Sequence, residues 1–186
     1  MEAQIAERRG VDDLAGAATV GIRTYGPEIL GYLTAVLKND ADAADAFSAF
    51  CEDVWRGLAA FRGEASFKTW AYKLAWHAAL RILRDPYKRR GRALATREAE
   101  ALAAEVRDAT APYMKTDAKD GLADIRATLD PEEQTLLVLR VDRGLSWSEI
   151  TIVLEGEPTE AALRKRFERL KEKVRREAIA RGLMTR

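Results

Sequence analysis

Three helix starts follow one another in the last third of this 186-residue chain. Residues 130–133 and 146–149 are capping boxes, in which an Asp or Ser and the Glu three positions later satisfy free backbone N–H groups at the start of a helix. Thr159 is a third N-cap. The order of helix, turn, helix, turn and helix predicts a helix-turn-helix unit.

The last predicted helix, residues 160–181, is strongly basic. Between positions 163 and 181 nine Lys and Arg residues stand against three acidic residues. Cations on the first turns of such a helix favour a recognition helix in the major groove of DNA. The alternative is a three-helix packing unit with a solvated basic face. The candidate DNA contacts are Thr159, Arg164, Lys165 and Arg169.

Residues 61–84 combine a Gly-containing loop with an aromatic helix that begins after Ser66, a good N-cap. Asp85-Pro86 ends this helix, because the residue before a proline is disfavoured in the α region. We predict that Trp70 faces the core and that Tyr72, Trp76 and His77 face the other side, where aromatic rings can stack on unpaired bases. The alternative is that one or two of these three side chains complete the core.

A basic run follows, with six positive residues and one negative residue between positions 84 and 97. It predicts phosphate contacts, and a solvated helix end is the alternative. Upstream, apolar spacing predicts a helix over 20–38, broken or started at Gly26-Pro27, and a second helix over 41–58. The fold class is therefore all-α, with two small helical domains, 1–94 and 128–186, joined by a linker at 95–127.

Composition excludes several classes of protein. One Cys and one His cannot build a disulfide framework or a Cys/His zinc site. Asp42 and Asp45 lie one helical turn apart, as in some Mg²⁺ sites, but no further acid or phosphate loop joins them. Without a signal sequence or a membrane-spanning run, we expect a cytoplasmic protein with no cofactor, no metal and no enzymatic activity.

The residues that carry a family resemblance are DADAADAFSAFCEDVWRGL, FRGEASFKTWAYKLAWHAALRILR with its basic tail, and LDPEEQTLLVLRVDRGLSWSEITIVL with the basic helix after it. Together they resemble the extracytoplasmic-function (ECF) class of bacterial RNA polymerase sigma factors, over about residues 20–92 and 128–178. The resemblance implies a protein that binds core RNA polymerase, reads the −10 and −35 promoter elements and helps open the DNA. It also implies an anti-sigma factor as a possible regulator.

The resemblance also implies which residues make these contacts. The helix over 41–58 would dock on the polymerase clamp through Asp42, Asp45, Ser48, Glu52 and Trp55. The −35 element would be read by Thr159, Arg164, Lys165 and Arg169. The −10 contacts would be Phe61, Arg62, Gly63, Glu64, Ser66, Lys68, Tyr72, Trp76, His77, Arg81, Arg84, Lys88, Arg89 and Arg90.

The chain departs from the family pattern at three places. Ser48-Ala49 replace a common Gln-Glu pair, Trp76-His77 and Arg81 replace Arg-Asn and Asp, and the turn at 155–162 is about two residues longer. Phosphorylation of Ser48 by a regulatory kinase would restore a negative charge, which is a hypothesis. The rival function is a helix-turn-helix regulator of duplex DNA that works without polymerase. Such a regulator has no use for the loop and aromatic helix at 61–84.

Overall fold

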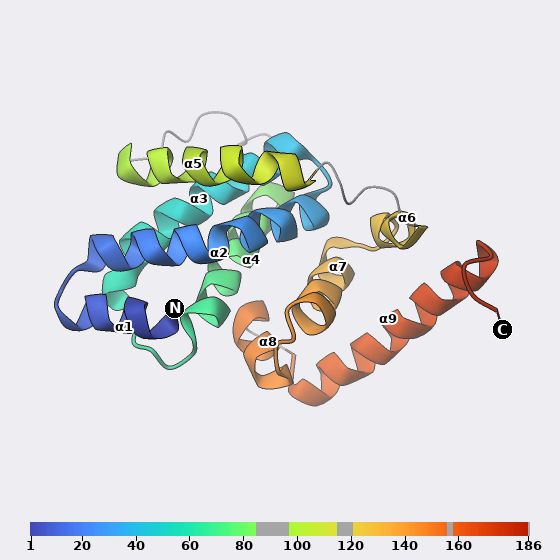
Figure 1. Cartoon of the computed structure of the whole chain (residues 1–186). Coiled ribbons are helices and arrows are strands. Elements are labelled where there is room, and N and C mark those ends of the chain that lie inside the picture. Colours follow the sequence, from blue (N-terminus) through green and yellow to red (C-terminus); the bar gives the residue numbers. More distant parts are fainter. Residues whose placement is uncertain (85–96, 115–120, 156–157, 186) are drawn as a thin grey trace.

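The computed structural model describes residues 1–84, 97–114, 121–155 and 158–185, and these residues form helices joined by short turns (Figure 1). No strand occurs among them. The α-helices are α1 (Glu2–Gly10), α2 (Leu14–Leu37), α3 (Asp40–Gly57), α4 (Phe67–Arg84), α5 (Arg97–Met114), α6 (Gly121–Ala127), α7 (Pro131–Leu137), α8 (Trp147–Leu154) and α9 (Glu160–Ala180). A 3₁₀ turn (Leu58–Ala60) follows α3, and a π-helical turn (Val138–Asp142) follows α7.

Helix α2 runs without interruption through Gly26-Pro27, so the predicted break at this pair is wrong. A proline inside a helix costs about 3 kcal/mol, but α2 is packed by α1, α3, α4, α5 and α7, and this packing holds it together. Gly26 lies at a close approach of α2 to α3 and α5. A Cβ atom there would be 3.0 Å from Val106 Cγ1 and 3.3 Å from Phe47 Cζ.

The core of the first half lies between α2, α3 and α4. The predicted apolar stripe of α3 is confirmed, since all of its members are fully buried. Tyr32 of α2 and Tyr72 of α4 meet edge to face at 5.5 Å. Burial raises the pKa of the Cys51 thiol to about 12, as expected of a structural cysteine. The buried residues of the α3 stripe are Phe47, Phe50, Cys51, Val54 and Leu58.

Most of the segment predicted as a linker is helical where the structure describes it. Helix α5 packs on α2 and α3 and buries Ala99, Leu102, Ala103 and Val106. The short helix α6 contacts α9. The division of the chain into two domains with a linker at 95–127 stays a prediction.

The C-terminal elements begin where the sequence predicts. Both capping boxes are present, around Asp130 and around Ser146, and Thr159 caps α9 by accepting from Ala162 N at 3.2 Å. The apolar side chains of α7, α8 and the first turn of α9 pack in the same core as α2 and α4. The two halves of the chain are therefore in direct contact, and the far end of α9 projects beyond them (Figure 1).

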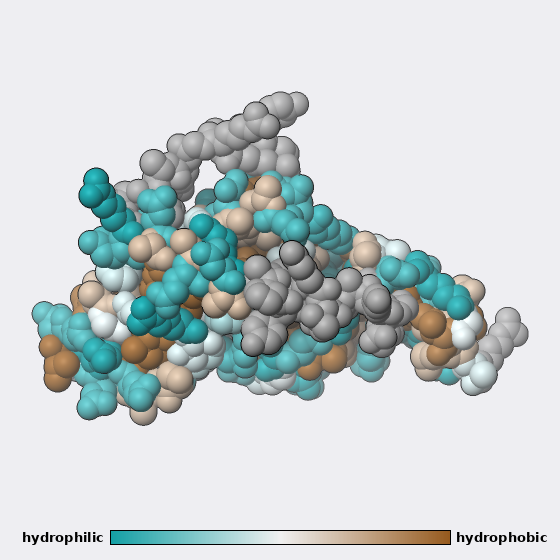
Figure 2. All heavy atoms as spheres, turned by 45° about the horizontal axis from the view of Figure 1, so that its top comes forward, coloured by the Kyte–Doolittle hydropathy of each residue, from teal (hydrophilic) through white to brown (hydrophobic). Residues whose placement is uncertain are grey.

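The surface is mostly hydrophilic on the face shown in Figure 2, where hydrophobic residues form small separate patches. Among the described residues, every helix is too short or too polar to cross a membrane.

Candidate nucleic-acid and polymerase interface

The loop before α4 has an aromatic base and a charged tip. The Phe61 ring stacks on Trp70 at 4.8 Å between centroids and meets Phe67 edge to face at 6.2 Å. Gly63 takes φ +78°, which favours glycine. Arg62 and Glu64 lie on either side of it, 3.6 Å apart and highly exposed. The loop therefore offers solvent two charged side chains on a packed aromatic platform.

Tyr72 and Trp76 are buried, so the prediction that they lie on an exposed face of α4 is wrong. Tyr72 is 0% exposed and Trp76 is 5% exposed. Trp70, predicted to face the core, is only partly buried. The reason is that α4 is covered on two sides, by α2 and α3 on one and by α8 on the other. The alternative in which these two rings complete the core therefore holds in this conformation.

Three other −10 candidates of α4 lie at or near the surface. His77 Nε2 is 3.0 Å from Glu155 Oε2, and Arg81 pairs with Asp53 of α3 at 2.5 Å. Arg84 is exposed at the end of the helix. Lys88, Arg89 and Arg90 lie outside the described residues.

The start of α4 meets the start and end of α8 through polar contacts. Thr69 Oγ1 donates to Glu149 Oε1 at 3.1 Å, and Lys73 Nζ is 2.7 Å from Glu155 Oε1. Lys68 Nζ donates to the Arg143 carbonyl at 3.4 Å. Two candidate −10 residues, Lys68 and His77, are thus engaged by the C-terminal half.

The two glutamates of this contact have lowered pKa values for different reasons. The hydrogen bond from Lys73 lowers the pKa of Glu155. For Glu149 burial alone would raise the pKa, but hydrogen bonds from Ser146 and Thr69 and the charge of Lys68 outweigh it, so the pKa is lowered. The contact between the two halves therefore stabilises the charged form of Glu155, and it adds to the effect of the Ser146 capping box on Glu149.

This contact should weaken in acid. A carboxyl with a lowered folded-state pKa adds stability that is present above its ordinary value, 4.5 here, and is lost as the pH falls below it. We expect the native chain to lose more unfolding free energy between about pH 5 and pH 3 than the variant Glu149→Gln/Glu155→Gln. Urea unfolding at several pH values measures this. Parallel curves for the two proteins would contradict it.

A groove of about 650 Å³ runs between α4, α7, α8 and α9. Its floor is apolar and includes Trp76 and Leu163, and its rim is charged. Arg84, a −10 candidate, and Arg169, a −35 candidate, both line it. The two predicted DNA-contact surfaces therefore meet at this groove.

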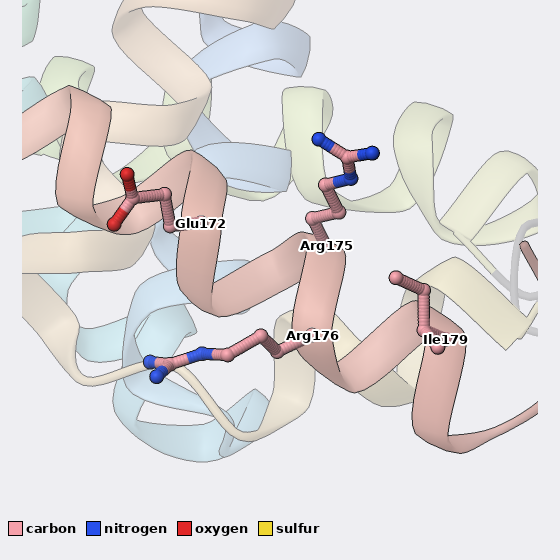
Figure 3. Close-up of a pocket in the computed structure, with 4 residues that line it drawn as sticks. All are labelled: Glu172, Arg175, Arg176 and Ile179. Carbon is pink, nitrogen blue, oxygen red and sulfur yellow. The ribbon is translucent and has the colours of Figure 1, made fainter. Parts of the chain in front are cut away.

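The −35 candidates lie on the first half of α9. Arg164 is 3.0 Å from Glu160 and lies over the Trp147 ring at 5.6 Å, and Lys165 is exposed. Further along α9 a hollow of about 310 Å³ is lined by Glu172, Arg175, Arg176 and Ile179. Figure 3 shows Arg175 and Arg176 leaving the helix in different directions, with Glu172 on the same stretch of α9.

The docking candidates lie on α3, and the structure brings them along one side of the helix. Asp45 is exposed, and Asp42 and Trp55 are partly exposed. Ser48 Oγ accepts from Arg107 Nη1 of α5 at 2.6 Å, and Glu52, 6% exposed, pairs with Arg56 at 2.6 Å. In the described part of the chain, no group of three His, Cys, Asp or Glu side chains could hold a metal ion.

Sequence reasoning missed the polar contacts that reach these surfaces from distant elements. Glu2 and Arg9 of α1 contact the two ends of the loop before α4, and Glu155 contacts α4. No local pattern signals such contacts, because each joins residues more than fifty positions apart. The sequence shows that Glu2 and Arg9 are charged, but it does not show which residues they contact.

Two comparisons with known proteins agree with this arrangement. Residues 22–90 match the family Sigma-70 region 2, which covers most of α2 and all of α3 and α4. RNA polymerase sigma factor YlaC of Bacillus subtilis (strain 168) is 29% identical over 133 residues, which are 71% of this chain and 76% of that protein. The chain thus carries its docking candidates and its −10 candidates on helices that match sigma-70 region 2, and the two similarities together support an RNA polymerase sigma factor of the extracytoplasmic-function type.

Proposed function

We propose that this sigma factor docks on core RNA polymerase through the α3 face (Asp42, Asp45, Ser48, Glu52 and Trp55) and positions the polymerase at promoters. The loop 61–67 and α4 read the −10 element, and the first half of α9 reads the −35 element. The observation that carries the proposal is the region 2 match, because it spans α3, the loop and α4 in one segment. Core polymerase and promoter DNA are thus the two partners.

The mechanism is binding without covalent chemistry. Flipping a base out of duplex DNA costs a few kcal/mol. Contacts of the base with the loop, together with phosphate contacts of the arginines on α4, offset that cost. Neither of the two similarities favours the rival function of a duplex regulator that works without polymerase. An anti-sigma factor is the regulator that suits this class, and Ser48 phosphorylation stays a hypothesis.

Promoter binding requires the two halves to separate. Elements centred at −35 and −10 are about 25 base pairs apart, which is about 85 Å along B-DNA at roughly 3.4 Å per base pair. Here the end of α8 touches α4, with 2.7 Å between Lys73 Nζ and Glu155 Oε1. In this closed conformation the readers are too close together to engage both elements, so we propose 1–94 and 128–186 as domains that move apart.

Zero-length carbodiimide coupling tests this opening, because it joins an amine to a carboxylate only where the two are in contact. We expect a Lys73–Glu155 cross-link in the free protein and its loss when core polymerase and promoter DNA are added. Lys173 and Glu133, 2.6 Å apart within the C-terminal half, are the matched control and should stay cross-linked. A holoenzyme that transcribes with the Lys73–Glu155 cross-link intact would contradict the proposed opening.

A further inference from the structure

Helix α1 lies across the base of the loop before α4 and contacts both of its ends. It precedes the segment that matches the sigma family, which begins at residue 22. Ile5, 2% exposed, anchors α1 in the core. Glu2, at one end of α1, reaches the start of α4, and Arg9, at the other end, reaches Phe61.

Glu2 caps α4 from outside that helix. Its carboxylate accepts from Phe67 N at 2.9 Å and from Lys68 N at 3.0 Å, and it also accepts from Tyr25 Oη at 2.8 Å. Ser66 Oγ accepts from Thr69 N at 3.0 Å. The first N–H groups of a helix have no partner within it, so Glu2 supplies two of the acceptors that α4 needs. A negative charge at this end is also favoured by the helix dipole.

Arg9 holds the other end of the loop. Its Nη2 donates to the Phe61 carbonyl, and its guanidinium lies 4.8 Å from the centre of the Phe61 ring. The Phe61 ring is the one that stacks on Trp70 of α4. Arg9 therefore fixes both the backbone and the ring of the residue where the loop begins.

We infer that α1 holds the −10 reading loop in its conformation, and that Glu2 and Arg9 are positioning residues for the capture of an unpaired base. Glu2 and Arg9 hold the ends of a loop whose tip, Arg62 to Glu64, has no contact of comparable strength among the described residues. A loop held at both ends keeps one opening for the base, and less ordering is needed when the base binds. The inference rests on the proposed function and adds residues that lie outside the family match.

The test uses the holoenzyme and a single-stranded DNA probe. A pool of oligonucleotides with a randomised central segment is selected once on native holoenzyme, and the selected sequence is then used for every variant. For Glu2→Ala/Arg9→Ala we expect about tenfold weaker binding of this oligonucleotide, because two charge-assisted contacts are lost. Affinity for core polymerase should not change, since the hydrogen bonds of Glu2 and Arg9 go to the loop, α2 and α4. Amide exchange at Phe67 and Lys68 should become faster, whereas Thr69 keeps Ser66 as its acceptor.

Matched controls are available on the same helix. Glu7 and Arg8 are exposed, so Glu7→Ala/Arg8→Ala makes the same changes in charge and should bind the oligonucleotide as the native protein does. Arg9→Lys keeps a donor toward the Phe61 carbonyl and should recover most of the binding.

Two results would overturn the inference that α1 positions the −10 reading loop. The first is faster amide exchange at 67–68 with unchanged oligonucleotide binding. The second is an equal fall in oligonucleotide and core polymerase binding, which would mean general damage to the fold. If native holoenzyme selects no oligonucleotide at all, the proposed function itself fails, and the inference about α1 fails with it.

Discussion

Replacing Asp45 with Arg should weaken binding to core RNA polymerase by about thirtyfold or more, because a reversed charge at the centre of an interface costs about 2 kcal/mol or more. Asp45 is exposed and lies in the middle of the α3 docking face, so the fold should not change. Fluorescence titration of the labelled protein with core polymerase measures the affinity, and thermal unfolding checks the fold.

Asp40 provides the control for this substitution. It is an exposed acid of the same helix, but by the 100° spacing of helical residues it lies about 140° around the helix axis from Asp45. Asp40→Arg should therefore bind core polymerase as the native protein does. Equal losses for Asp40→Arg and Asp45→Arg would show a general electrostatic effect and would remove the assignment of this face.

Tyr72→Ala should cost about 3–5 kcal/mol of unfolding free energy, as expected when a large buried aromatic side chain is truncated. Its ring is fully buried against Tyr32, and its hydroxyl contacts Glu28 at 3.4 Å. Tyr72→Phe keeps the ring and should cost only about 0.5–1.5 kcal/mol. Urea unfolding of the three proteins gives these values.

The Tyr72 result separates a core residue from a DNA contact. If Tyr72→Ala folds as stably as the native protein but loses promoter binding, the ring contacts DNA. Its buried position then does not describe its role in promoter binding. A large loss of stability agrees with the structure.

Local signals predicted helix starts well, because they depend on neighbouring residues alone. The two capping boxes and the Thr159 cap lie where expected, since each needs only a side chain and the backbone N–H groups next to it. The continuation of α2 through Gly26-Pro27 was not predictable in this way. The packing of five other helices around α2 decides it, and this packing involves residues far away in the chain.

The exposed face of α4 could not be predicted from spacing. A helical period identifies one apolar face, but α4 is covered from two directions. Tyr72 packs against Tyr32 of α2, and Trp76 lines the groove between α4 and the C-terminal helices, so both become core residues. The docking face of α3 was easier to anticipate, because acidic residues such as Asp45 stay at the surface whatever packs on the other side.

Helix α5 shows a further limit of sequence reasoning. Its small buried residues, Ala99 and Ala103, give a weak apolar signal, and charged residues surround them. The segment therefore looked like a linker. Its place on α2 and α3 depends on the fit of Val106 against Gly26, which no local pattern reveals.

The most direct test of sigma activity is promoter-specific run-off transcription by core RNA polymerase with and without this protein. Genomic fragments from the organism that supplies the polymerase serve as templates. We predict discrete transcripts that appear only when the protein is present, and their loss with Asp45→Arg. The absence of any specific transcript, together with no detectable binding to core polymerase, would contradict the assignment.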